Sequence, residues 1–98
     1  MKRNDAASRF EVEAGEETGI LQYSKDDSAI TLVHTEVPPA LEGRGIGGEL
    51  AKAGLEYARQ EGLQVVPRCG FVVSYIKRHP EYLDLVRPDY RARVSRSE

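Results

Sequence analysis

The feature that most constrains the fold is a glycine-rich loop, Glu42-Gly43-Arg44-Gly45-Ile46-Gly47-Gly48, which directly precedes an amphipathic segment. Four glycines within six positions let the backbone approach a ligand without obstruction by side chains. Apolar residues between 46 and 60 recur at the spacing of one helical stripe. The first amides of a helix have no acceptor within it, and the helix dipole adds positive charge there. The loop therefore predicts an anion site suited to a phosphate or diphosphate.

Three segments with strand character come before this loop. Residues 8–14 alternate apolar and acidic side chains, and residues 18–24 and 29–37 follow after short turns. Three strands joined in this way predict an antiparallel meander. In the third strand we expect His34 to share the inward face with Ile30 and Leu32, as a satisfied core histidine.

The segments after the loop predict a crossover. A helix over residues 46–60 ends at Gly62, and residues 63–68 read as a strand parallel to the third one. Residues 70–77 predict a second helix, and Pro80 opens a last helical turn. The order β-β-β-α-β-α-α predicts an α+β fold, a mixed sheet with helices packed on it.

Length and composition favour one globular domain. The chain has 98 residues, 40% of them apolar and 31% charged, with a net charge of −2. We expect a flexible N-terminus over residues 1–8, a domain over 9–86 and a basic, disordered tail over 87–98. The chain has one cysteine, and its spacing from the two histidines does not predict a metal site. It has no apolar run of about 18 residues and no leader-like start, so we expect a cytoplasmic protein.

The loop does not match the common nucleotide motifs in context. Gly43-x-Gly45-x-x-Gly48 has the spacing of the dinucleotide fingerprint, but residues 38–42 separate it from the strand end. About 20 residues later stands Arg68, where that fingerprint needs an acid. The Gly-Lys-Ser/Thr of a triphosphate loop is absent. Coenzyme A, a diphosphate with a long neutral arm, remains.

The segment from Thr35 to Leu50 resembles the central motif of the GNAT acetyltransferases, in which a strand runs into a Gln/Arg-x-x-Gly-x-Gly/Ala loop. The resemblance implies that acetyl-CoA is the acyl donor, with its diphosphate on the loop amides and its pantetheine arm along the strand end. Glu42 replaces the usual Gln or Arg, so its side chain is expected to point away. The implied coenzyme-binding residues are Glu36, Val37, Gly43, Arg44, Gly45, Ile46, Gly47 and Gly48.

A second segment is similar to a small branch of that superfamily, which lacks the usual first helices and last hairpin. Its features are Pro67-Arg68-Cys69, then Tyr75, then His79-Pro80-Glu81-Tyr82, and the resemblance extends over residues 9–86. The resemblance implies catalytic roles for Cys69 and Tyr75. Cys69 stands at a predicted helix start, which favours a thiolate, and it either lines the acetyl site or accepts the acetyl group. Tyr75 is placed to protonate the leaving thiolate.

These features predict an N-acetyltransferase that uses acetyl-CoA and an amine acceptor, either a small amine or a lysine side chain. Two alternatives stay open: a coenzyme A-binding module with little turnover, and a non-catalytic domain that binds a protein partner. The acidic body of the chain favours a basic acceptor over nucleic acid. We expect no membrane association, and either a monomer or a homodimer.

Overall fold

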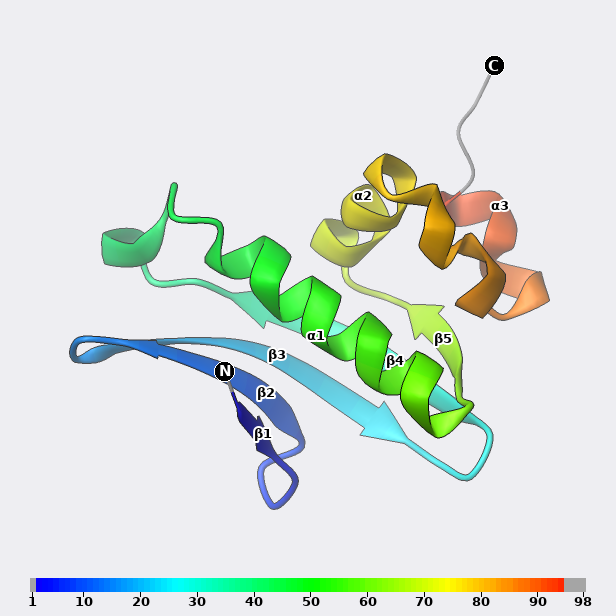
Figure 1. Ribbon diagram of the computed structural model, residues 1–98, viewed down its shortest axis with the longest axis horizontal. Helices are drawn as coiled ribbons and strands as arrows, with labels where there is room; N and C mark the ends of the chain where they lie inside the picture. Colours follow the sequence, from blue (N-terminus) through cyan, green and yellow to red (C-terminus); the bar gives the residue numbers. More distant parts are fainter. Residues whose placement is uncertain (1, 95–98) are drawn as a thin grey trace.

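A mixed five-stranded sheet forms the base of the molecule (Figure 1). The computed structural model describes residues 2–94. The strands lie side by side in chain order: β1 (Lys2–Asn4), β2 (Arg9–Ala14), β3 (Glu17–Lys25), β4 (Ala29–Glu36) and β5 (Gln64–Pro67). The first four pair antiparallel, and β5 pairs parallel to β4, from Ala29 opposite Gln64 to Leu32 opposite Pro67. The meander and the parallel crossover predicted from the sequence are confirmed.

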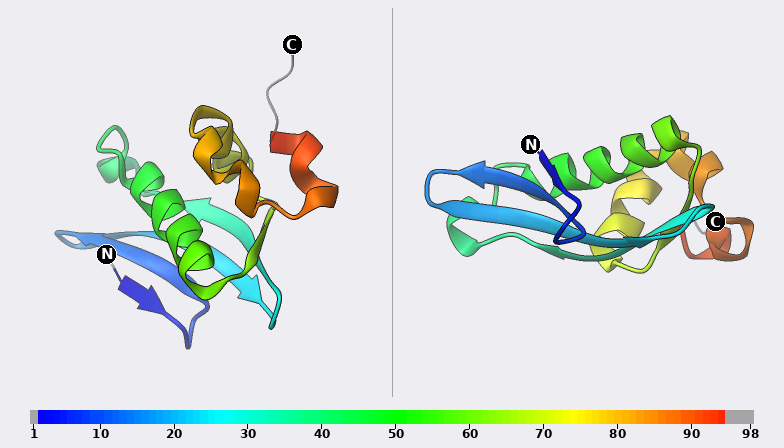
Figure 2. Two further views of the ribbon diagram at one scale, coloured as in Figure 1. Left: turned by 45° about the vertical axis from the view of Figure 1, so that its right-hand side comes forward. Right: turned by 90° about the horizontal axis from the view of Figure 1, so that it is seen from below.

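Helices and turns complete the α+β fold expected from the sequence. They are the 3₁₀-turn η1 (Pro39–Leu41), α1 (Ile46–Glu61), α2 (Gly70–Arg78), η2 (Pro80–Leu85), η3 (Pro88–Tyr90) and the short α3 (Arg91–Val94). Gly62 ends α1 in a left-handed conformation, φ 70°, and its N–H donates to the carbonyls of Ala58 and Arg59. Figure 2 shows α1 over one face of the sheet, with α2 and the later turns beside it at the β5 end.

The core lies between α1 and the sheet. An amphipathic helix must bury its apolar stripe, and here the stripe packs on the inward residues of the strands. The fully buried side chains include Phe10, Leu21, Ile30, Leu32, Leu50 and Leu55. Gly54 allows a close approach of α1 to the sheet, because a Cβ there would stand 3.1 Å from Leu21 and 3.3 Å from Leu32. This close packing holds α1, and the loop at its start, in a defined place over β3 and β4.

A bulge in β4 reverses the predicted orientation of His34. The register passes from Tyr23 opposite Leu32 to Gln22 opposite His34, so Val33 is an extra residue. Because side chains alternate along a strand, one extra residue turns every later side chain to the other face. The prediction that His34 faces the core is therefore wrong. Its side chain is 54% exposed, with Nε2 3.5 Å from Oε2 of Glu36. Thr35 faces the helices instead, opposite buried Leu21.

Both terminal segments are more ordered than the sequence suggests. Residues 2–4 form β1, which the strand pattern did not reveal, and Lys2 lies opposite Glu11 of β2. Residues 88–94, expected to belong to a disordered tail, form η3 and α3, and Val94 is only 2% exposed. Burial of this apolar side chain stabilises the folded conformation of the segment. Met1 and the rest of the predicted tail, residues 95–98, lie outside the described residues. Within residues 2–94, no helix has the length and apolarity needed to cross a membrane.

Candidate functional site

The glycine-rich loop leaves a row of backbone N–H groups without acceptors. Gly43 and Gly45 adopt left-handed conformations, with φ of 85° and 76°, which other residues rarely take. The first bond that closes toward the helix runs from the N–H of Glu49 to the carbonyl of Gly45, 3.0 Å. Among residues 2–94, no acceptor meets the N–H groups of Gly45, Ile46, Gly47 and Gly48. These groups stand at the positive end of the α1 dipole, so they suit an anion.

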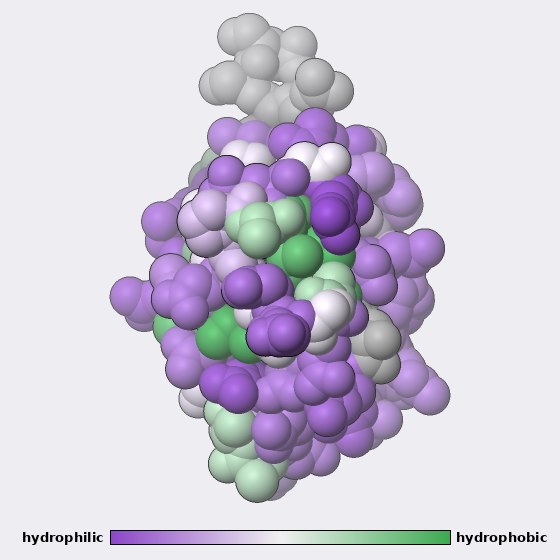
Figure 3. All heavy atoms as spheres, turned by 90° about the vertical axis from the view of Figure 1, so that its left-hand side faces the viewer, coloured by the Kyte–Doolittle hydropathy of each residue, from purple (hydrophilic) through white to green (hydrophobic). Residues whose placement is uncertain are grey.

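A pocket of about 200 Å³ opens directly beside these amides. Its lining residues come from the end of β4, the loop, the first turn of α1 and the first turn of α2: Val37, Leu41, Glu42, Gly43, Gly45, Ile46, Gly47, Gly48 and Phe71. Figure 3 faces this end of the molecule and shows apolar surface exposed within a hydrophilic face. The pocket therefore combines backbone N–H groups without acceptors among residues 2–94 with apolar walls next to them.

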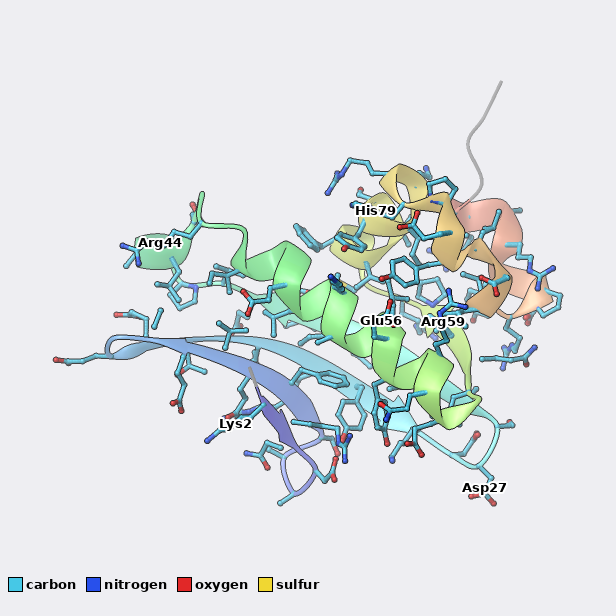
Figure 4. The ribbon with its side chains drawn as sticks, in the orientation of Figure 1. Lys2, Asp27, Arg44, Glu56, Arg59 and His79 are labelled. Atoms are coloured by element: carbon cyan, nitrogen blue, oxygen red, sulfur yellow. The ribbon has the colours of Figure 1, made fainter. Side chains whose placement is uncertain are left out.

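The two charged loop residues differ in their relation to the pocket. Arg44 is exposed, and its side chain points away from α1 at the outer end of the loop (Figure 4). Glu42 is exposed and contributes to the pocket lining. Among residues 2–94, the N–H groups that line the pocket at the start of α1 belong to the backbone.

Strands β4 and β5 separate just beyond the pocket. Their pairing ends at Leu32 and Pro67, where the Leu32 carbonyl accepts from the N–H groups of both Arg68 and Cys69, at 3.0 and 3.1 Å. Beyond this point β4 continues to Glu36 without a described strand on its β5-facing edge. Backbone groups of that edge are consequently available to a ligand that enters between β4 and α2.

Cys69 lies where the two strands part. It directly precedes α2, its side chain is buried, and its Sγ lies 3.2 Å from Oγ1 of Thr35. Either of these two atoms can donate in that hydrogen bond. Thr35 reaches Cys69 only because of the bulge at Val33, so the sequence pattern by itself did not identify this contact.

Tyr75 lies on α2 beside the first turn of α1. A Cβ on Gly48 would stand 3.6 Å from Cε2 of the Tyr75 ring, and the His79 ring stacks on Tyr75 with centroids 4.1 Å apart. Burial raises the pKa of Tyr75, and the nearby charge of Glu81 raises it further. Within residues 2–94, no protein group hydrogen-bonds the Tyr75 hydroxyl, so that hydroxyl is available to a ligand.

The structure groups the predicted residues in two neighbouring places. Val37 and the loop residues other than Arg44 line the pocket, whereas Arg44 does not. Cys69 stands at the end of the strand pairing, and Tyr75 stands beside Gly48. Glu36 is exposed at the end of β4 and faces His34 rather than the pocket. Sequence reasoning missed Phe71, which lines the pocket from α2 and carried no motif of its own. Among residues 2–94, no group of three or more His, Cys, Asp or Glu side chains is placed to hold a metal ion.

Comparison with known proteins assigns the family. A model of the GCN5-related N-acetyl-transferase family matches residues 9–85. The chain is 41% identical over 61 residues to Protein NATD1 of Mus musculus, covering 60% of this chain and 56% of the mouse protein. It is 41% identical over 61 residues to Protein NATD1 of Homo sapiens, covering 60% and 54%, and 37% identical over 59 residues to that of Danio rerio, covering 58% and 54%. The match spans about half the length of these relatives. With its glycine loop, its parting strands and a family match over most of its length, the chain belongs to the GCN5-related N-acetyltransferase family.

Proposed function

We propose that this domain binds acetyl-CoA and transfers its acetyl group to an amine, either a small amine or a lysine side chain. The observation that carries the proposal is the row of N–H groups from Gly45 to Gly48, which have no acceptor among residues 2–94 and belong to residues that line a pocket. Such a row at a helix start suits the coenzyme diphosphate. Family membership supports the same donor, since enzymes of this family generally use acetyl-CoA.

The pantetheine arm would follow β4 toward Cys69. From the loop, the free edge of β4 leads past Val37 and Glu36 to the point where the strands part. Backbone N–H and C=O groups of an unpaired edge bind an extended amide-containing chain in the manner of an added strand. This path brings the end of the arm toward Cys69 and Thr35.

The chemistry requires a neutral amine, a polarised thioester carbonyl and a proton for the departing sulfur. In the transfer, a carbon–nitrogen bond forms at the acetyl carbon as the carbon–sulfur bond breaks. The nitrogen then loses one proton to water, and the departing sulfur gains one. Tyr75 would supply the proton that the thiolate receives, because a tyrosine hydroxyl is protonated at neutral pH. Burial of Tyr75 raises its pKa further in the same direction. Cys69 is buried and hydrogen-bonded to Thr35, which favours a role in lining the acetyl site over a role as the nucleophile.

A pair of glycine variants tests coenzyme binding at the loop. Gly45 and Gly15 both have positive φ, 76° and 65°, and a Cβ at either would meet nothing within 4 Å. Gly45→Ala and Gly15→Ala should each destabilise the fold by about 1–2 kcal/mol through backbone strain. Only Gly45→Ala should weaken coenzyme A binding, by about tenfold or more, about 1.4 kcal/mol. Calorimetric titration, with thermal melting to report stability, measures both.

The same titration decides between the proposal and its alternatives. Wild-type protein should bind coenzyme A and melt at a higher temperature when the ligand is present. If wild-type protein does not bind coenzyme A, the proposal is wrong and the loop serves only the packing of the protein. Binding without thiol release above background, across a panel of amines, would leave a coenzyme A-binding module without turnover.

A further inference from the structure

Phe71 is a large apolar side chain that the fold does not bury. Its side chain is 40% exposed, and within residues 2–94 only Val33, at 42%, is a comparable exposed hydrophobic residue. It stands in the first turn of α2, whose buried residues are Val72, Tyr75 and Ile76. Exposed aromatic rings that line a concave site often contact ligands. Phe71 does line the pocket beside the loop.

Two aromatic rings of α2 pack against two consecutive glycines of α1. A Cβ on Gly47 would stand 2.7 Å from Cζ of Phe71, a separation that real side chains do not show. A Cβ on Gly48 would lie 3.6 Å from the ring of Tyr75, which follows Phe71 by one helical turn. Gly47 therefore admits the Phe71 ring against the start of α1. This packing sets the ring beside the N–H groups that we propose for the diphosphate.

The pocket has two chemically different halves. Backbone N–H groups of the loop form one half, and the other is apolar, made by Val37, Leu41, Ile46 and Phe71. A ligand that uses both halves carries an apolar group next to its diphosphate. In coenzyme A, the diphosphate carries adenosine on one side and the branched, dimethyl-substituted pantoyl segment on the other. A dinucleotide has a polar sugar in place of the pantoyl segment, and a nucleoside diphosphate has no group there.

We propose that Phe71 is a specificity-determining residue, whose ring contacts the pantoyl segment and selects coenzyme A over nucleotides that carry the same diphosphate. The proposal rests on the proposed coenzyme binding and deepens it. The ring provides the wall on the α2 side, where the ligand would pass from the loop toward the parting strands. Removing an apolar wall should cost affinity only for the ligand that has an apolar group to place there.

The test compares two ligands on wild-type protein and two variants. The ligands are coenzyme A and its nucleotide half, adenosine 3′-phosphate 5′-diphosphate, which keeps the diphosphate and lacks the pantetheine arm. Phe71→Ala should weaken coenzyme A binding about tenfold and change nucleotide binding less than about twofold. Phe71→Leu, which keeps apolar bulk, should lose less coenzyme affinity than Phe71→Ala. Unfolding midpoints confirm that the partly exposed position leaves both variants folded.

The outcomes separate this proposal from the function it rests on. If Phe71→Ala weakens the nucleotide half as much as coenzyme A, the ring acts through the shape of the loop, and the proposed contact is wrong. Unchanged affinity for both ligands also excludes the contact. If wild-type protein binds neither ligand, the proposed coenzyme binding itself fails, and the Phe71 proposal fails with it.

Discussion

At the scale of single residues, one buried carboxylate shows how the fold accommodates charge. Glu11 is 5% exposed and is the buried charged residue among positions 2–94. Its Oε2 accepts hydrogen bonds from Nε of Arg9 at 2.7 Å and Nδ2 of Asn4 at 3.1 Å. Lys2 Nζ lies 3.9 Å from Oε1. A buried charge without partners would be costly, so β1 completes the environment that Glu11 needs.

Stability should depend on the ionisation of Glu11. Hydrogen bonds from Arg9, and then from Asn4, lower the pKa of this carboxyl below its ordinary value of 4.5. Because the folded pKa is lowered, its stabilisation is complete above about pH 4.5 and is lost as the pH falls through the folded pKa. The melting temperature of Glu11→Gln should lie below that of wild type at pH 7, and the two should converge below about pH 4.5. A difference that stays constant down to pH 3 would contradict this origin.

Tyr75→Phe tests the proposed proton donor without a large change in packing. Loss of the hydroxyl should lower kcat about 100-fold or more and leave the Kd for coenzyme A unchanged. Tyr82→Phe is a matched control, because Tyr82 is also buried but donates its hydroxyl to Glu56 at 2.6 Å. Stopped-assay rates and titrations measure both variants. Equal rates for Tyr75→Phe and wild type would remove Tyr75 from the chemistry.

At the scale of elements, the contact of α1 with the sheet positions the loop that we propose as the anion site. The start of α1 rests on Gly19 of β3, where a Cβ would stand 2.8 Å from Cγ2 of Ile46. Near its middle, Gly54 lies against Leu21 and Leu32, both fully buried. Since these glycines remove side chains at the interface, the helix lies close to β3 and β4, and its first turn lines the pocket.

Alanine substitutions at two glycines of α1, Gly54 and Gly48, should change the free energy of unfolding in opposite directions. Gly54→Ala adds a Cβ 3.1 Å from Leu21, whose buried side chain cannot move aside easily, so we expect destabilisation by about 1–3 kcal/mol. Gly48→Ala adds a Cβ in ordinary contact, 3.6 Å from Tyr75, and should stabilise by up to about 1 kcal/mol through helix propensity. Urea unfolding measures both. Stabilisation by Gly54→Ala would show that the interface has room.

At the scale of the whole molecule, the last described residues close the structure beside β5. Val86 forms a bridge with Val65, and the N–H of Arg87 donates to the Val65 carbonyl at 2.9 Å. Val94, on α3, is buried with the same core, near α2. The segment that follows α2 thus covers the outer edge of β5. An uncovered strand edge would present unpaired backbone groups to other chains.

Val94→Ala tests whether that closure stabilises the domain. Truncating a buried valine should lower the free energy of unfolding by about 2 kcal/mol. Val33→Ala removes the same atoms from an exposed side chain and should change stability by less than about 0.5 kcal/mol. Chemical denaturation of the full chain compares them. Equal effects of the two variants would mean that α3 adds nothing to the stability of the core.

Much of the architecture was predictable because it depends on local patterns. The alternation in residues 9–14, the two prolines after β4, and Gly62 at the end of α1 each act within a few residues. The N–H groups without acceptors at the start of α1 could also be predicted, since they follow from helix geometry. That they bind an anion remains our proposal. The family model that matches residues 9–85 confirms the family that the resemblance of residues 35–50 implied.

The orientation of particular side chains depended on contacts between distant segments. The bulge at Val33 arises from pairing with β3, and it alone turns Thr35 toward Cys69 and His34 toward solvent. The position of Phe71 against Gly47 depends on how α2 packs on α1, which no short-range pattern encodes.

By itself, then, the sequence determined where strands, helices and the glycine loop occur, because turns, periodicity and helix ends are governed by neighbouring residues. Only the tertiary structure decided what those elements place together: the thiol of Cys69 beside Thr35, the ring of Phe71 beside the free amides, and Val94 within the core. The physical reason is that bulges, close helix contacts and burial follow from packing between segments many residues apart.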